Sequence, residues 1–249
     1  MRMNKIVPFS VVILLITVSF AGVASAVQLG TPTPTQLSAA ATTYYGIYIT
    51  GSVAVGMPFT INGTLTDANG NPIAGATIQL QNSTDNVNWN NVTTATTNAN
   101  GAYQLGNNES AVNTYYYRTT YAGSTTYTNA TSNVVSVTVT KIPTTLTATA
   151  SAKIVAVNQQ FTVSGTLKTQ GTPSTALVSQ PVYLEGSYDN ITWFRISANA
   201  TTKAGGAYSF AGYISQTGSY YLRAHFDGTA TYAGSVSNAI LVRVVPPPT

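Results

Sequence analysis

Hydrophobic and polar residues alternate along most of the chain. In residues 220–226 the apolar side chains take the even positions, while Tyr221, Arg223 and His225 take the odd ones. Residues 135–139 follow the same rule, with valine at every second position. Because successive side chains of a β-strand point to opposite faces, this pattern predicts strands with one buried face. Turns rich in Gly, Pro and Asn separate such runs at intervals of roughly 8 to 15 residues, which is typical of a β-sandwich.

The second half of the chain repeats the first. Residues 59–65 (FTINGTL) return as 161–167 (FTVSGTL), and residues 85–89 (DNVNW) return as 189–193 (DNITW). Further matches keep the same order, with an offset of 102 to 105 residues between the copies. Self-similarity at a nearly fixed period marks tandem structural units. The sequence therefore predicts two copies of one module.

Each copy is predicted to be an all-β sandwich of the immunoglobulin type, because about seven strands in about 100 residues match that architecture. In the first copy the predicted strands centre on Tyr48, Ile61, Leu80, Trp89, Tyr103, Tyr117 and Val137. A proline at position 143 interrupts one strand pattern before the next begins, which predicts the boundary between the copies. The predicted division is a signal peptide (1–26), a flexible Thr/Pro/Ala lead-in (27–43), two Ig-like sandwiches (44–141 and 142–245) and a proline-rich tail (246–249).

The first 26 residues have the three parts of a secretory signal peptide. Arg2 and Lys5 precede an apolar run over residues 6–23, and small residues at 24–26 fit a cleavage site. The run is also near the length that spans a membrane, so an uncleaved anchor is the alternative. After cleavage we expect no membrane span. The proline-rich end fits either the natural end of the chain or the start of a longer spacer.

Charged residues are scarce. They make up 6% of the chain, against about 25% in ordinary soluble proteins. Without the leader, eight basic and six acidic residues remain and no basic cluster is left, so we expect no nucleic-acid partner. The chain has no cysteine, which excludes thiolate metal ligands and cysteine nucleophiles.

Two stretches resemble families of surface modules. Residues 63–80 (GTLTDANGNPIAGATIQL) are similar to the signature of carboxypeptidase-regulatory-like and invasin-like sandwiches, and residues 221–235 are similar to the closing strands of bacterial Ig-like (Big) repeats. The second copy departs from the first pattern over residues 168–173, which lack the acidic residue and the Asn-Gly turn. The resemblance implies a bacterial or archaeal Ig-like repeat protein of the cell surface, adhesin-like or associated with an S-layer. It implies no particular ligand.

Residues able to transfer protons or attack a substrate are few, and we predict no catalytic site, no metal site and no cofactor. His225 is the only histidine, and it is expected on the outward side of its strand. The alternative, a catalytic base, needs a partner that the sequence does not identify.

Two Asp-Asn pairs occupy equivalent places in the copies. We expect Asp85 and Asp189 each to open a hairpin turn, and Trp89 and Trp193 to point into the cores. A glycoside hydrolase would need a second carboxylate a few ångströms away, and none is in an obvious position.

Residues 67–71 (DANGN) begin like a calcium loop. Pro72 and Ile78 stand where an EF-hand needs Gly and Glu, so that motif is excluded. A type I′ turn at Asn69-Gly70 is predicted instead. A calcium site outside the EF-hand class is the alternative.

Tyrosines and sequons are the remaining candidates for surface chemistry. The first predicted strand contains three tyrosines, Tyr44, Tyr45 and Tyr48. In the triple at residues 115–117, at least one tyrosine should be exposed, where it could contact a ligand or pair with a side chain on the neighbouring strand. Asn62 begins a sequon in mid-strand and is expected to stay unmodified. The candidate N-glycosylation sites are Asn82, Asn91, Asn108, Asn129, Asn190 and Asn199.

The predicted function follows from export, duplication and the absence of reactive groups. We expect a secreted or cell-surface structural or adhesin-like protein that serves spacing, envelope assembly or adhesion. Its expected partners are other surface proteins, glycans, or copies of itself that pair through edge strands. The alternative is a carbohydrate-binding or accessory module of a larger secreted enzyme.

Overall fold

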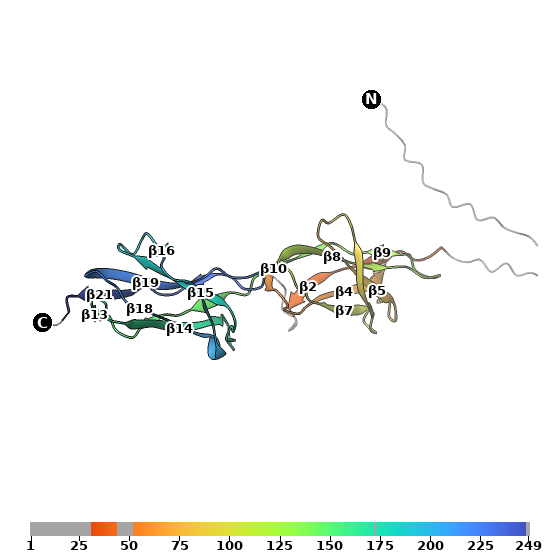
Figure 1. The fold of residues 1–249 in the computed structure, drawn as a ribbon. Helices are drawn as coiled ribbons and strands as arrows, with labels where there is room; N and C mark the ends of the chain where they lie inside the picture. Colours follow the sequence, from red (N-terminus) through yellow and green to blue (C-terminus); the bar gives the residue numbers. More distant parts are fainter. Residues whose placement is uncertain (1–30, 44–51, 172, 248–249) are drawn as a thin grey trace, which may run out of the picture.

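The computed structural model describes residues 31–43, 52–171 and 173–247. Strands dominate these residues, with a single turn of 3₁₀ helix at Ala204–Gly206, and they form two β-sandwiches that follow one another along the chain (Figure 1). The predicted all-β fold is confirmed. The predicted signal peptide and the tyrosines at positions 44, 45 and 48 lie outside the described residues.

The first sandwich is built around two long strands that pair with short ones. The smaller sheet contains β4 (Phe59–Asp67), which pairs antiparallel with β1 (Thr35–Leu37), β2 (Ala40–Thr43) and β7 (Ala102–Asn107). The larger sheet has the order β3 (Ser52–Ala54), β10 (Val135–Thr140), β8 (Asn113–Tyr121), β5 (Thr77–Ser83) and β6 (Asn90–Thr96), with β9 (Ala130–Thr131) beside β8. Of these pairs, β3 with β10 is parallel.

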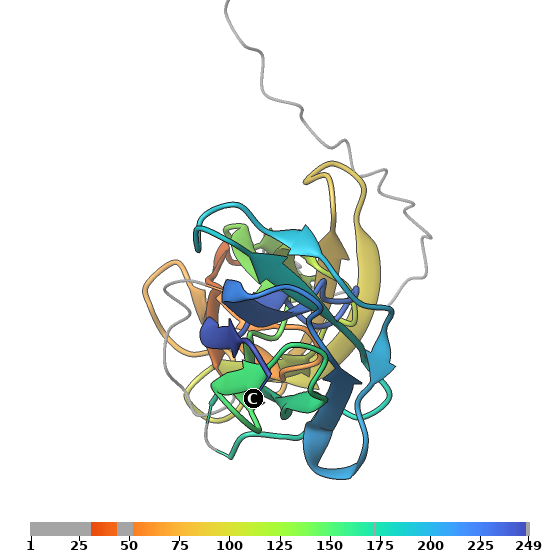
Figure 2. The same cartoon turned by 60° about the vertical axis from the view of Figure 1, so that its left-hand side comes forward.

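The second sandwich repeats this topology. In its smaller sheet β14 (Phe161–Thr169) pairs with β11 (Thr144–Leu146), β12 (Thr149–Ala150) and β18 (Ala207–Gly212). Its larger sheet has the order β13 (Ile154–Ala156), β21 (Ile240–Val245), β19 (Gly218–Phe226), β15 (Pro181–Ser187) and β16 (Phe194–Arg195), with β17 (Ala200–Thr201) beside β15 and β20 (Ser235–Val236) beside β19. Figure 1 and Figure 2 show the two layers of strands.

Each sandwich has its own core, made by the inward residues of both sheets. Phe59 and Ile61 from β4 are fully buried in the first core, and Ala224 and Phe226 from β19 are fully buried in the second. On β19 the outward Arg223 and His225 are partly exposed, as the period-two pattern predicts, while on β4 Thr60 between Phe59 and Ile61 is buried as well. Burying a large apolar side chain stabilises a fold by about 1.5–3 kcal/mol.

The predicted flexible lead-in over residues 27–43 is wrong from residue 35 onward. β1 and β2 pair with β4 along its length, and Ala39 and Ala41 are buried in the first core. The first sandwich therefore begins at β1 and not at residue 44. Small side chains hide the hydrophobic alternation of this stretch, which is why composition suggested a linker.

The predicted type I′ turn at Asn69-Gly70 is also wrong. Such a turn needs a positive φ at both central residues, but of the two only Gly70 has one, at 84°. Asp67 explains the difference, because its carboxylate accepts the N–H groups of Asn69 and Asn71 at 2.9 Å. The loop is the three-residue form in which a glycine alone is left-handed.

Within residues 31–43, 52–171 and 173–247, no helix has the length and hydropathy of a membrane span.

Candidate functional site

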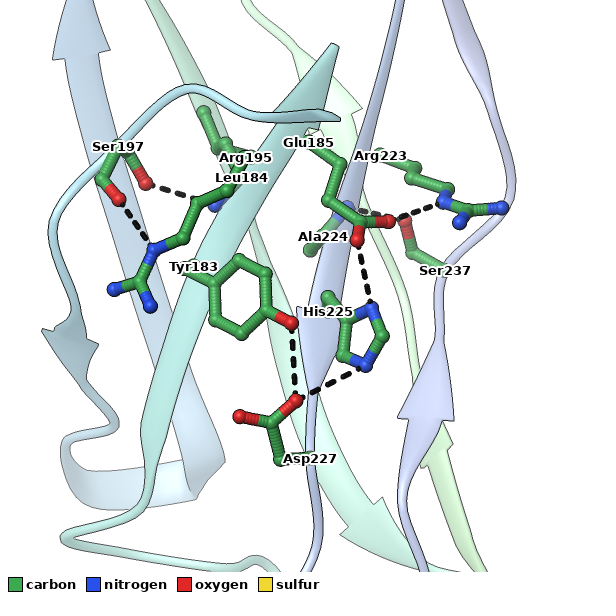
Figure 3. A network of polar contacts seen from close by, with 10 residues as sticks. All are labelled: Tyr183, Leu184, Glu185, Arg195, Ser197, Arg223, Ala224, His225, Asp227 and Ser237. Carbon is green, nitrogen blue, oxygen red and sulfur yellow. Dashed lines mark hydrogen bonds and ion pairs between the residues drawn. The ribbon is translucent and has the colours of Figure 1, made fainter. Parts of the chain in front are cut away.

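A cluster of charged and aromatic side chains lies on the outward face of β15 and β19 in the second sandwich. The strands pair so that Tyr183 faces His225 and Glu185 faces Arg223. These four residues alternate with the buried Leu184, Leu222 and Ala224, so their side chains share the outer face. Arg195 on β16 and Asp227 after β19 complete the cluster (Figure 3). We call these six residues the outer-face cluster.

Glu185 lies at the centre of the cluster. Its Oε2 accepts the Arg223 Nε–H at 2.6 Å, and its Oε1 lies 3.1 Å from His225 Nδ1. The Glu185 side chain is only 12% exposed. A carboxylate shielded from water needs polar partners to stabilise its charge, and Arg223 and His225 are those partners of Glu185.

His225 connects Glu185 to Asp227. Its Nε2 lies 3.2 Å from Asp227 Oδ1, and its ring stacks on Tyr183 with centroids 4.9 Å apart and planes 10° apart. The Tyr183 hydroxyl donates to the same carboxylate at 3.0 Å (Figure 3). Burial, followed by the hydrogen bond and charge of Asp227, raises the pKa of Tyr183, so this phenol stays a donor.

The prediction that His225 lies on the outward side of its strand is confirmed, but it does not lack partners. The register of β15 against β19 brings Glu185 beside His225. The local sequence around His225 does not predict this register, so the contact could not be expected from the sequence. Both ring nitrogens face carboxylates, so among the described contacts the imidazole is directed at no hydroxyl nucleophile. The phenol, imidazole and Glu185 carboxylate bind one another or Asp227, and Asp227, which is 73% exposed, is the carboxylate of the cluster that faces solvent.

The two tryptophans are not in the cores, so the prediction that they point inward is wrong. Trp89 and Trp193 are both half-buried, and each lies under an arginine from the outward register of the sheet. The guanidinium carbon of Arg118 lies 4.2 Å from the Trp89 ring centroid, and that of Arg223 lies 4.0 Å from the Trp193 centroid. Cation–π attraction therefore holds each ring on the outer face.

Of the contacts on this outer face, the arginine–tryptophan pair is the one described in both copies. The first sandwich has Gln79, Gln81, Thr120 and Ala122 where the second has Tyr183, Glu185, His225 and Asp227. Arg118 donates to the neutral Gln81 at 2.8 Å, where Arg223 donates to a carboxylate. The outer-face cluster is thus specific to the second copy.

The predicted turn role of the Asp-Asn pairs is confirmed. Asp189 Oδ1 accepts the N–H groups of Ile191 and Thr192 at 2.8 and 2.7 Å, while Asn190 is left-handed with a φ of 60°. These hydrogen bonds to the charged form hold the pKa of Asp189 well below its usual value. Asp85 makes the equivalent contacts in the first copy, and its pKa is lowered for the same reason.

The tyrosine triple follows the predicted alternation. Tyr115 and Tyr117 are buried in the first core, while Tyr116 is half-buried on the outer face.

The sequon asparagines differ in exposure. Asn62 donates its side-chain amide to the Thr42 and Thr60 hydroxyls, so this amide is engaged within the smaller sheet. Among the candidate glycosylation sites Asn82 is half-buried, and the exposed ones are Asn91, Asn108, Asn129, Asn190 and Asn199.

Several solved structures are similar to the chain at low sequence identity. Invasin, a bacterial integrin-binding protein, is 17% identical, with 86% of this chain and 40% of that one covered and a TM-score of 0.44. A tetra-tandem repeat from the extending region of a large adhesion protein is 13% identical, with 86% and 50% covered and a TM-score of 0.43. The fibronectin(III)-like modules of Clostridium thermocellum CbhA are 16% identical, with 82% and 94% covered and a TM-score of 0.29. The chain spans half or less of the first two structures.

Part of the chain matches a known domain family. None of the curated proteins compared with the chain matches it. Residues 60–150, from β4 to β12, match the carboxypeptidase regulatory-like domain family. Over these residues the chain is similar to carboxypeptidase regulatory-like domains, which confirms the resemblance predicted from residues 63–80.

Proposed function

We propose that the chain is an exported, non-catalytic protein of the cell surface, in which two Ig-like sandwiches act as a spacer and the outer-face cluster makes a specific adhesive contact. One observation carries this proposal: the duplication preserves the scaffold while the outer face differs. The matched residues of the copies are glycines, core side chains and turn residues, whereas Glu185, His225 and Asp227 have uncharged counterparts. A sandwich used only as a spacer has no need of a charged cluster that its own duplicate lacks.

Export is the part of this proposal that is tested first. The native protein would be recovered from its source cells and its N-terminus read by mass spectrometry. We expect a mature chain that begins after Ala26, and that protease added to intact cells removes. A chain that retains Met1 and resists protease until the cells are lysed would refute surface localisation.

Glycosylation belongs to the same proposal. Exposed sequons lie on β6 and on loops of both sandwiches, and glycans there would supply the solvation that scarce surface charge does not. We expect glycopeptides at Asn91, Asn129 and Asn190, and an unmodified Asn62, whose amide is engaged by Thr42 and Thr60. Glycopeptide mapping of the native protein tests both expectations.

A carbohydrate-binding or accessory module is the second candidate. Exposed tyrosines favour it, because Tyr188 and Tyr213 are 69% and 66% exposed and present rings that stack on sugars. The tryptophans favour it less, because an arginine covers one face of each ring. Co-sedimentation with insoluble cellulose and chitin is the test, and Tyr188→Ala with Tyr213→Ala should abolish any binding seen.

A further inference from the structure

An open groove lies between the two sheets of the second sandwich, on the side bounded by β16 and β18. Its volume is about 690 Å³, within the range of roughly 300 to 1,000 Å³ typical of ligand sites. Phe194 and Tyr213 stand exposed at its rim, and Leu184, Phe210 and Leu222 line it deeper inside. No Asp, Glu, Lys, Arg or His contributes to the lining. The lining therefore favours an uncharged occupant.

The first sandwich shows what fills the equivalent place there. Tyr117 occupies the position of Leu222, since the two pair with the equivalent residues Asn82 and Gly186. The Tyr117 ring is fully buried, meets Phe59 edge-on at 5.4 Å and accepts a hydrogen bond from an asparagine amide through its hydroxyl. Leu222 is smaller than that ring, while on the facing strand Phe210 stands where the first sandwich has Leu105. The groove of the second sandwich extends to both Leu222 and Phe210.

The covering strand differs as well. In the first sandwich the seven-residue β6 pairs with β5 through six residue pairs, with one bulge between Leu80 and Gln81. In the second, the same stretch is divided into β16 and β17, each two residues long. Ile196 still donates its N–H to the Leu184 carbonyl, but residues 197–199 leave the ladder, and all four residues contribute to the groove wall. The second sandwich is therefore open where the first is closed by a full strand.

The free edge of β18 borders this opening. On β14, Thr162 exchanges hydrogen bonds with Ser151, on the side away from β18. Its cross-strand neighbour Ala211 must then direct its own N–H and C=O away from β14. The same alternation applies to Ser209, two residues earlier. Among the described residues these backbone groups have no further partner. An extended peptide can pair with such an edge, whereas a sugar or a small aromatic molecule cannot use it as a ladder.

We propose that the groove binds an uncharged, extended peptide segment of a partner protein, which adds as a strand to β18 and inserts an aromatic side chain beside Leu222. Backbone pairing at Ser209 and Ala211 supplies the register, and the space beside Leu222 selects the ring. This inference goes beyond the proposed surface function and does not depend on it, because it concerns a different face from the outer-face cluster.

The test uses the full mature chain and an acetylated, amidated hexapeptide of alternating Thr and Tyr. Calorimetric titration should show binding, and amide NMR shifts should change at Ser209 and Ala211. Leu222→Tyr places the first copy's own ring in the groove and should weaken binding at least about tenfold, because the aromatic burial is lost. Leu241→Tyr, the same change at an exposed position on the same sheet, should leave binding unchanged. Failure of the unmodified chain to bind the hexapeptide would overturn the proposal.

A second variant separates peptide binding from the other occupants. Ala211→Pro removes one edge N–H and leaves Leu222 unchanged, and it should also weaken binding of the hexapeptide. If Ala211→Pro binds as tightly as the parent, or if N-acetyltyrosinamide competes as well as the hexapeptide, the site is one for a small aromatic molecule. A concentration-dependent dimer that Leu222→Tyr abolishes would instead identify a second copy of this chain as the occupant. Each of these results overturns the proposed partner, while export and cell-surface localisation would be unaffected.

Discussion

At the scale of single residues, the repeated Gly-Thr-Leu of each copy has a specific packing role. A Cβ built on Gly165 would collide with the Thr147 carbonyl and the Tyr208 hydroxyl, which are themselves hydrogen-bonded. Gly63 has the same role in the first copy, where Tyr103 donates to the Ser38 carbonyl. These glycines have ordinary φ values, so close approach is what requires them.

Gly165→Ala should therefore destabilise the second sandwich. Overpacking of a tight contact costs about 1–3 kcal/mol, and here both colliding atoms are held by a hydrogen bond. Urea unfolding followed by Trp193 fluorescence, in a Trp89→Phe background, measures the loss. Gly212→Ala is the matched control, since nothing lies within 4 Å of its added Cβ. Equal effects of the two changes would contradict this role of Gly165.

The turn aspartates predict an acid dependence of stability. In the folded chain the pKa of Asp189 lies below its ordinary value of 3.8, because backbone N–H groups bind the charged form. A lowered folded-state pKa contributes stability that is present above the ordinary value and is lost as the pH falls through the folded-state value. We expect the melting temperature of the second sandwich to fall below about pH 4, and Asp189→Asn to reduce that fall. An unchanged acid slope in Asp189→Asn would show that other groups govern it.

At the scale of elements, the sequence predicts the long strands well and their edges poorly. β4, β8, β14 and β19 carry large alternating side chains, and the duplication confirms each of them a second time. The hydrophobic pattern does not predict β1, because Ala and Thr give little contrast between buried and exposed positions. The repeat does contain a signal, since residues 35–41 (TQLSAAA) return as 144–150 (TTLTATA). The position of each tryptophan depends on an arginine across the sheet, and local alternation does not report such a contact.

The break between β16 and β17 coincides with a one-residue insertion in the second copy, and the structure is needed to see what this insertion does. The offset between the copies grows from 104 residues at Trp193 to 105 at Thr202, so the second copy has one extra residue between these positions. One inserted residue breaks the pairing of a strand and reverses the faces of its side chains. The pattern shows the insertion, but only the pairing shows that the insertion opens the sandwich.

Removing β1 and β2 tests the corrected start of the first sandwich. A chain that begins at residue 31 should unfold like the mature protein, whereas a chain that begins at residue 44 should lose at least about 3 kcal/mol, because buried contacts and two β4 pairings disappear. Trp89 fluorescence in a Trp193→Phe background reports the first sandwich alone. If both truncations unfold alike, β1 and β2 do not stabilise the first sandwich.

At the scale of the whole molecule, charge is concentrated in one copy. Six of the eight basic residues after the leader lie in residues 142–245, where they accompany three acidic ones. All three ion pairs found among the described residues belong to the outer-face cluster. Since the scaffold is the same in both copies, these charges are not required to fold the module.

Converting the outer-face cluster to the residues of the first copy separates its binding role from its structural one. Glu185→Gln, His225→Thr and Asp227→Ala together remove the three ion pairs, and partly exposed pairs of this kind each contribute about 0–1 kcal/mol. The second sandwich should therefore stay folded by Trp193 fluorescence, while binding of the labelled chain to intact source cells should fall at least about tenfold if two charge-assisted contacts are lost. The reverse graft, with Gln81→Glu, Thr120→His and Ala122→Asp in the first copy, controls for general charge. Undiminished cell binding by the triple variant would show that adhesion uses another face.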